Sequence, residues 1–291
     1  MIAASDNEIS PIAIDFKNIK TTQPDIIARI IEIDESSPNC FREMDCLLRA
    51  DQAVASFILR VANSPIYNRS QPIRTLPIAT SLLGINIIRS LVILAFSRSV
   101  FSNSKNTLVC KHIWHHSLLT AIASHRLCLD LGETAQCEEA FVAGLVHDIG
   151  KVLLFSHARK EYMQALSYAL EQDCPSVDAE QFFLGTDHRQ IGLQAVHEWR
   201  LPIQFSQYVG TNLDQLSDQQ AENKVLLSLA VANAYIKGMG IGANPLPPEV
   251  LKENLSAYGL AEAFIDSMLE ATYLQTLMDN EIFQYCAHDQ H

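Results

Sequence analysis

Apolar side chains recur every three or four residues along most of this chain, which is the spacing of one face of an α-helix. The pattern predicts helices at 22–31, 41–48, 54–61, 78–92, 113–132 and 141–149, and again at 158–172, 188–199, 222–237 and 260–286. Residues 9–16 alternate instead, which fits an extended arm or a short strand. Strands do not alternate with helices, so no parallel sheet is expected. The sequence predicts an all-α fold, a bundle of many helices.

Polar breaks in the helical pattern predict how the chain is divided. The segment 103–106, Asn-Ser-Lys-Asn, is the clearest boundary. We predict an N-terminal arm at 1–20, an N-terminal helical subdomain at 21–102, a second helical subdomain at 107–240 and a C-terminal helical extension at 241–291. None of these parts resembles a separate signal-input domain. We therefore expect any input to come from another chain or a ligand.

Composition and charge exclude several classes of protein. With 48% hydrophobic and 19% charged residues, this chain of 291 residues is globular rather than disordered. A net charge of -12 disfavours direct binding to nucleic acid, whose phosphates are also negative. The seven cysteines include no Cys-x-x-Cys pair, as in the reduced thiols of cytoplasmic proteins. No secretory signal or uninterrupted apolar run of ~20 residues is found, so we expect a cytoplasmic protein with no membrane partner.

Charge is unevenly distributed along the sequence. Residues 52–129 contain no Asp or Glu but eight Lys or Arg residues. This segment could favour an anionic ligand or an acidic partner. We prefer the simpler interpretation of separate surface groups neutralised by the rest of the chain, because a stretch of sequence is not a surface patch.

The strongest chemical signal lies in the run 143–151, AGLVHDIGK, where an apolar helix leads into His147 and Asp148. Imidazole and carboxylate groups are both ligands for divalent metals. Neighbouring helix positions point about 100° apart. The two side chains can therefore reach one ion only near a helix end, where Gly150 could relax the backbone.

Other histidines could complete such a site. His116 and His188 are the candidates to join His147 and Asp148, either in a shared polar cluster or in a metal site. We expect only hydrogen-bonded or surface roles for His112, His115 and His197. Lys151 and Arg74 are the candidates for holding an anion.

Two competing motifs do not fit their usual functions. The sequence HEWRL at 197–201 lacks the second histidine of a zinc-protease HExxH motif. The glycines at 238, 240 and 242 follow a helix rather than a strand, so they predict a helix end and a loop instead of a dinucleotide site.

Several ordered segments together resemble one known family, the HDOD family, or HD-related output domain, of bacterial signalling proteins. The resemblance extends over about residues 22–240, and Asp51-Gln52 stands where the family usually has Asp-Pro. The segments that resemble the family are the run LRVANSPIY at 59–67, Ile73 with Ala79 and Leu83-Gly84, IWHHS at 113–117, GLVHDIG at 144–150, and Asp187-His188 with Ile191-Gly192 through Trp199, Leu201 and Pro202.

The resemblance implies an HD-domain-like helical bundle, related to metal-dependent phosphohydrolases in which His and Asp side chains hold one or two metals. It assigns the ligand positions to His116, His147, Asp148 and His188. Some positions depart from the active enzymes. Residues 208–212, Tyr-Val-Gly-Thr-Asn, replace a histidine pair, and Asn233 stands in place of a late aspartate. An amide is a poorer metal ligand than a carboxylate, so a two-metal site lacks ligands, whereas one divalent ion could still bind.

Three functions remain open at this point. The leading hypothesis is a non-catalytic regulatory module that binds other signalling proteins, with a degenerate metal site and no required cofactor. The second is a metal-dependent phosphohydrolase or phosphodiesterase that acts on a nucleotide or cyclic dinucleotide. The third is a sensor that binds a nucleotide without cleaving it. The sequence does not predict the oligomeric state.

Overall fold

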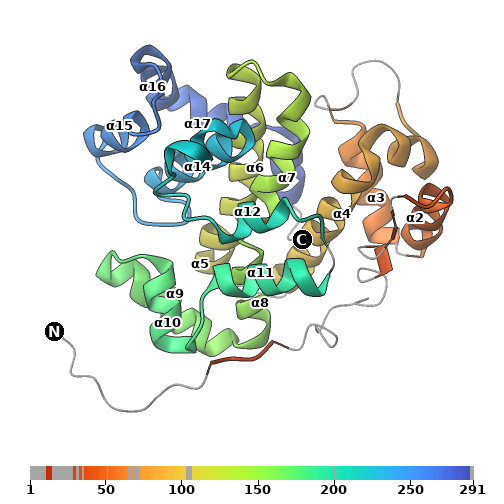
Figure 1. The fold of residues 1–291 in the computed structure, drawn as a ribbon, viewed down its shortest axis with the longest axis horizontal. Coiled ribbons are helices and arrows are strands. Elements are labelled where there is room, and N and C mark those ends of the chain that lie inside the picture. The colour runs from red at the N-terminus through yellow and green to blue at the C-terminus, as the bar shows by residue number, and fades with distance from the viewer. Residues whose placement is uncertain are drawn as a thin grey trace.

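The computed structural model describes residues 11–14, 29–30, 33–34, 36–50, 52–64, 67, 72–102, 107–199 and 201–288. Within these residues the chain forms helices, turns and loops but no strand, which confirms the predicted all-α fold (Figure 1). The helices are α2 (Cys40–Arg49), α3 (Gln52–Ala62), α4 (Leu76–Ser102), α5 (Thr107–Val109), the π-helix η1 (Cys110–His115), α6 (His116–Asp130), the 3-10 helix η2 (Thr134–Gln136), α7 (Cys137–Val146), α8 (Ile149–His157), α9 (Arg159–Gln172), α10 (Ser176–Leu184), α11 (His188–Glu198), α12 (Phe205–Gly210), α13 (Asp218–Glu222), α14 (Lys224–Gly238), α15 (Pro248–Ser256), α16 (Glu262–Leu269), α17 (Ala271–Met278) and α18 (Glu281–His288).

Helices α2 and α3 pack against α4 at one side of the molecule (Figure 1). The Asn63 side chain closes the loop between α3 and α4, because it donates to the carbonyl oxygens of Leu59 and Ile73 and accepts from the Ile73 amide. Helix α4 bends at Gly84, whose φ of 77° is a conformation that glycine adopts readily.

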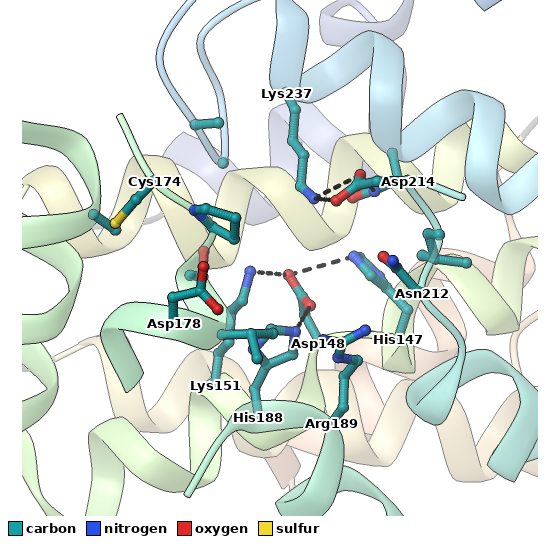
Figure 2. A pocket seen from close by; sticks show the side chains of 18 of the residues that line it. His147, Asp148, Lys151, Cys174, Asp178, His188, Arg189, Asn212, Asp214 and Lys237 are labelled. Atoms are coloured by element: carbon teal, nitrogen blue, oxygen red, sulfur yellow. Dashed lines mark hydrogen bonds and ion pairs between the residues drawn. The ribbon is translucent and has the colours of Figure 1, made fainter. Parts of the chain in front are cut away.

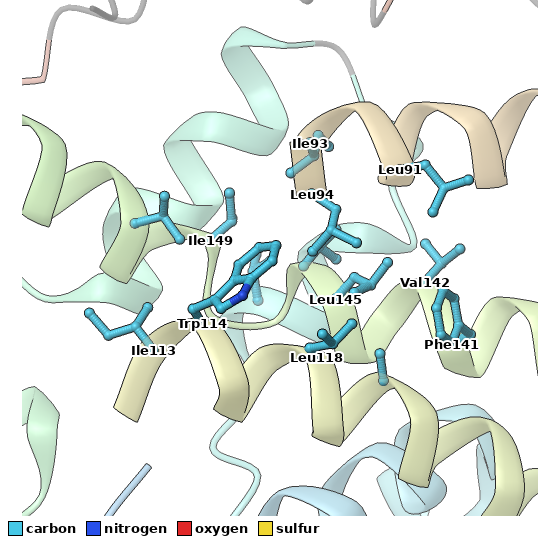
Figure 3. Close-up of a cluster of buried hydrophobic side chains, with 14 of the residues drawn as sticks. Leu91, Ile93, Leu94, Ile113, Trp114, Leu118, Phe141, Val142, Leu145 and Ile149 are labelled. Atoms are coloured by element: carbon cyan, nitrogen blue, oxygen red, sulfur yellow. The ribbon is translucent and has the colours of Figure 1, made fainter. Parts of the chain in front are cut away.

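The main core lies where α4, η1, α6, α7 and α8 meet (Figure 3). Trp114 and Leu118 face Leu145 of α7 and Leu94 of α4 across this interface (Figure 3). All four side chains are buried. One continuous set of buried apolar residues extends from Ile30 to Phe283. The predicted subdomains on either side of residues 103–106 thus share a hydrophobic core, and their division remains a prediction.

Helices α6 and α7 form an antiparallel pair, and α14 packs on the same two helices. Gly144 lets α6 and α7 approach closely, since a Cβ atom at this position would overlap the backbone of Ala121. The predicted helix at 141–149 is interrupted: α7 ends at Val146, and α8 begins at Ile149 after a turn made by His147 and Asp148.

The C-terminal part differs from the single helix predicted at 260–286. The chain forms α16, α17 and α18 instead. Glu270 adopts an extended conformation with ψ of 138°, which ends α16. The Asn280 side chain then accepts from the Ile282 amide at the start of α18. The bond at Asn280 is a local side-chain-to-backbone contact of the kind that competes with a continuous helix.

The N-terminal residues are described only in part. In the predicted arm, the Ile12 amide donates to the Leu184 carbonyl at the end of α10. Most of the predicted helix at 22–31 lies outside the described residues. Arg89 of the basic segment is buried and donates to the Ile33 carbonyl. Arg126 pairs with Asp130 one turn along α6. These two arginines therefore have separate local roles.

Two helical stretches, Leu76–Ala95 and Thr134–His157, are long and apolar enough to cross a membrane by composition. In their most apolar windows, 67% and 89% of the residues are buried in the fold. Such burial is typical of core helices that are hydrophobic on most sides.

Candidate metal centre

His147 and Asp148 lie in the turn between α7 and α8, so both side chains project from a helix end, as the sequence analysis requires for a shared site. Gly150 allows the first turn of α8 to approach α11, because a Cβ atom here would overlap the carbonyl oxygen of His188. Asp187 caps α11 and accepts from the two amides after His188. This packing brings His188 to the Asp148 carboxylate.

His116, His147 and His188 surround the buried Asp148 carboxylate on two sides. The Nε2 atoms of His116 and His147 lie 3.5 and 3.4 Å from Asp148 Oδ2. His188 Nε2 lies 3.5 Å from the other oxygen, Oδ1. The structure thus brings together the four residues that the resemblance assigns as ligands, with Asp148 at the centre. Figure 2 shows three of them, His147, Asp148 and His188.

Hydrogen bonds on the far side of each ring determine which nitrogen faces Asp148. His116 Nδ1 lies 2.9 Å from the Ile241 carbonyl oxygen, and His147 Nδ1 lies 2.8 Å from that of Gly144. A carbonyl oxygen only accepts, so each Nδ1 carries a hydrogen. In the neutral form that metal binding requires, the two Nε2 atoms, 3.3 Å apart, would present lone pairs toward each other and toward the carboxylate.

This set of three donors has the dimensions of a metal site. The distances among His116 Nε2, His147 Nε2 and Asp148 Oδ2 are 3.3, 3.4 and 3.5 Å. Donors bound about 2.1 Å from a tetrahedral ion lie about 3.4 Å from one another. Among the described residues, these three form the group of close, buried His and Asp side chains that could hold an ion. They fit one divalent ion, and His188 faces the opposite oxygen.

A fourth group, Lys151, binds the same carboxylate oxygen. Its Nζ atom lies 2.8 Å from Asp148 Oδ2, and both side chains are buried. Burial alone raises the pKa of the Asp148 carboxyl, but His147 and Lys151 outweigh it and hold the pKa well below its usual range. Burial alone lowers the pKa of Lys151, but Asp148 and Glu180 outweigh this effect and raise it. The pair is therefore ionised.

For His116, the effect of burial on the pKa is not outweighed by the neighbouring charges. Desolvation lowers the pKa of His116 well below its usual value, and the nearby Asp148 carboxylate opposes the shift without reversing it. The ring therefore stays neutral near pH 7, as a metal ligand must be.

A cavity of about 580 Å³ opens beside this centre. A second ion pair, Lys237 with Asp214 at 3.2 Å, lies on the facing wall (Figure 2). The charged groups in the lining nearly balance: they are Asp148, Asp173, Asp178 and Asp214 against Lys151, Arg189 and Lys237. The cavity therefore has no strong field for a polyanion.

The two predicted anion-binding residues do not meet. Lys151 lines the cavity, whereas Arg74 is exposed before α4 and is not among the lining residues. Arg189 and Lys237 are the other cations of the cavity. Neither of these two residues is among the anion-binding candidates that the sequence predicts.

The remaining histidines occupy the places expected of them. The buried His112 accepts from the Gly242 amide at 3.2 Å. The ring of His115 packs edge-on against Phe283, and the side chain of His197 is 87% exposed. The glycine-rich run predicted as a helix end and loop is confirmed, since α14 ends at Gly238.

Two residues of the site were missed in the sequence. Glu180 contacts His188, and Ile241 contacts His116 through its backbone. Glu180 had a weak signal: Pro175 and Gly185 bracket a short helix, and Glu180 shares one helix face with the buried Leu184. The Ile241 contact had none, since any residue offers a carbonyl.

Residues 208–212 and Asn233, the positions that depart from the active enzymes, supply few charged side chains that could bind a metal. Tyr208 points to Glu139, with its hydroxyl 2.5 Å from the carboxylate. Asn212 lines the cavity, and the Asn233 amide donates to Asp214 at 3.4 Å.

Comparison with known proteins agrees with this architecture. The HDOD domain family matches residues 21–212, about two thirds of the sequence. The chain belongs to the HDOD domain family. Part of its cavity wall nevertheless lies beyond the matched region, because Asp214 and Lys237 follow residue 212.

Known relatives are distant in sequence but similar in fold. An HDOD domain protein of unknown function from Geobacter sulfurreducens is 22% identical, with a TM-score of 0.64 over 91% of this chain and 94% of that chain. A protein from Shewanella amazonensis SB2B is 20% identical, with a TM-score of 0.62 over 92% and 95% of the two chains. An uncharacterized protein of Treponema pallidum is 19% identical over 182 residues. That match covers 62% of this chain but only 35% of its relative's length.

Proposed function

We propose that this HDOD protein is a non-catalytic regulatory module, which acts by binding other signalling proteins and whose HD-like site holds at most one metal ion. The observation that carries the proposal is the ion pair between Asp148 and Lys151. The Asp148 carboxylate is the acidic donor of the group formed by His116, His147 and Asp148, and Lys151 already neutralises it from 2.8 Å.

The ammonium group opposes tight metal binding. A divalent ion on Asp148 Oδ2 would share that oxygen with Lys151. At an effective dielectric constant of about 20, a double and a single positive charge about 4 Å apart repel by about 8 kcal/mol, twice the value for two single charges. One ion in the donor triangle is compatible with this arrangement at reduced affinity. When bound, such an ion would supply Lewis-acid chemistry to a phosphoester.

A second ion has few ligands in the described structure. Two-metal hydrolysis needs both ions to clamp the attacking and leaving oxygens. The facing wall offers the amides of Asn212 and Asn233 and an Asp214 carboxylate that is paired with Lys237. Amide oxygens are neutral and bind divalent cations less well than carboxylates do.

Relatives support the signalling role. A protein from Marinobacter aquaeolei VT8 with a TM-score of 0.58 is named as a candidate signal transduction protein. The described cysteines, from Cys40 to Cys174, are free thiols, which agrees with a reducing compartment. We therefore place this module in the cytoplasm.

The alternative is a metal-dependent phosphohydrolase that acts on a nucleotide or cyclic dinucleotide. The donor triangle of His116, His147 and Asp148 favours it. The similar Shewanella amazonensis protein is also named as a candidate phosphohydrolase. The nearly balanced charge of the cavity is less suited to a nucleotide polyphosphate.

The third function is that of a sensor, which binds a nucleotide without cleaving it. Under this function, a nucleotide that binds without cleavage should raise the melting temperature of the protein.

An assay with bis(4-nitrophenyl) phosphate and added Mn²⁺ separates the two functions. The proposal predicts no turnover above the rate of buffer with Mn²⁺. Turnover that disappears in His147→Ala but persists in the exposed control His197→Ala would establish an enzyme and overturn the proposal.

A further inference from the structure

Glu180 is a carboxylate buried in the middle of α10. Only 2% of the residue is exposed, and its neighbours on the same helix face are apolar. A buried carboxylate is costly unless hydrogen bonds or a positive charge compensate it. Its contacts therefore indicate what it does in the protein.

Both oxygens of Glu180 accept hydrogen bonds. Oε2 accepts from the His188 backbone amide at 2.8 Å and from its ring Nδ1 at 2.6 Å. Oε1 lies 3.4 Å from the hydroxyl group of the buried Tyr162, which donates to it. One side chain thus connects α9, α10 and the first residue of α11.

The bond at Nδ1 is the short contact of a charge-assisted hydrogen bond. It places a hydrogen on Nδ1 and turns Nε2 toward Asp148 Oδ1, at 3.5 Å. His116 and His147 are held by backbone carbonyls in the same way. His188 differs because its partner is a charged side chain from another helix.

We infer that Glu180 is the positioning residue of His188: it fixes the ring orientation and the nitrogen that faces Asp148, and so makes His188 available to a cation at this centre. A carboxylate on the far nitrogen also makes an imidazole a stronger donor. This inference rests on the proposed site, but the orientation of His188 does not depend on whether an ion binds there.

NMR of the ring nitrogens in the full chain, labelled with ¹⁵N-histidine, tests the inference without metal. In the wild type, His188 should carry its hydrogen on Nδ1. Glu180→Ala should lose this form, and Glu180→Gln should retain it, because an amide oxygen can accept the same bonds. Glu253→Ala, a change at an exposed glutamate of α15 that does not line the cavity, should leave the spectrum unchanged.

Either of two NMR results overturns the inference: a wild-type His188 without a hydrogen on Nδ1, or an unchanged His188 spectrum in Glu180→Ala. The wild-type spectrum alone can overturn the inference, so the test stays valid even if a variant fails to fold. A second readout is Zn²⁺ affinity from competition with a chelator: for an ion that His188 contacts, the affinity should fall about tenfold or more in Glu180→Ala but not in Glu253→Ala. A wild type that binds no Zn²⁺ removes the metal from the proposed function and leaves the NMR test intact.

Discussion

Lys151 Nζ lies 2.8 Å from Asp148 Oδ2 inside the protein, where neither side chain is more than 5% exposed. The oxygen that completes the donor triangle is therefore also the partner of a buried ammonium group. Buried ion pairs add little net stability, but losing one partner leaves an uncompensated charge. Under the proposed function, this pair would retain the site for its contribution to the fold rather than for catalysis.

Asp148→Ala should destabilise the protein by about 3 kcal/mol, because Lys151 loses its nearest counter-charge. Urea unfolding measures the change. The exposed control Asp178→Ala should cost less than about 0.5 kcal/mol. Adding Lys151→Met to Asp148→Ala should recover stability. An unchanged free energy of unfolding in Asp148→Ala would show that the carboxylate is not needed by the lysine.

Gly242→Ala should cost about 1–3 kcal/mol of stability. A Cβ atom at Gly242 would overlap the ring of His116, and the φ of 103° is unfavourable for alanine. Gly259→Ala is the matched control, since its φ is 75° but no atom lies within 4 Å of the added Cβ. Thermal unfolding should show a larger loss for Gly242→Ala. Equal losses of stability in the two variants would show that contact between the added Cβ atom and the His116 ring has no measurable cost.

Stability should fall as the pH decreases from about 6.5 to about 4, partly through His112. Burial, with Lys111 and Lys151 nearby, lowers the pKa of His112 from 6.5 to about 4. The unfolded chain therefore binds more protons than the folded chain in this range, so acid favours unfolding. His112→Asn keeps an acceptor for the Gly242 amide but does not titrate there.

The free energy of unfolding of His112→Asn, measured by urea titration at several pH values, should depend less on pH than that of the wild type. Some pH dependence should remain in His112→Asn, because the pKa of His116 is also lowered. Parallel curves for the wild type and His112→Asn would exclude a contribution from His112.

Sequence periodicity predicts the helices that bury one apolar face, and the structure confirms α9 and α11 within a residue of the expected limits. The predicted start of α11 is correct because Asp187 is a strong local cap. The π-helix η1 was missed, since an i+5 hydrogen-bond pattern over six residues leaves no distinct spacing in the sequence.

The candidate site is predictable only in part. The resemblance identifies His116, His147, Asp148 and His188, which the structure brings around one carboxylate. Their action as metal ligands remains a prediction. The contact of Ile241 with His116 depends on how a distant loop folds back, so local sequence contains no signal for it.

The most direct test of the central claim is the metal occupancy of the site, measured by anomalous diffraction from crystals grown with excess Mn²⁺. A non-catalytic module should contain no ion or one ion at this site, held by His116, His147 and Asp148. Two ions bridged by the Asp148 carboxylate, each with a full set of ligands, would contradict the non-catalytic account.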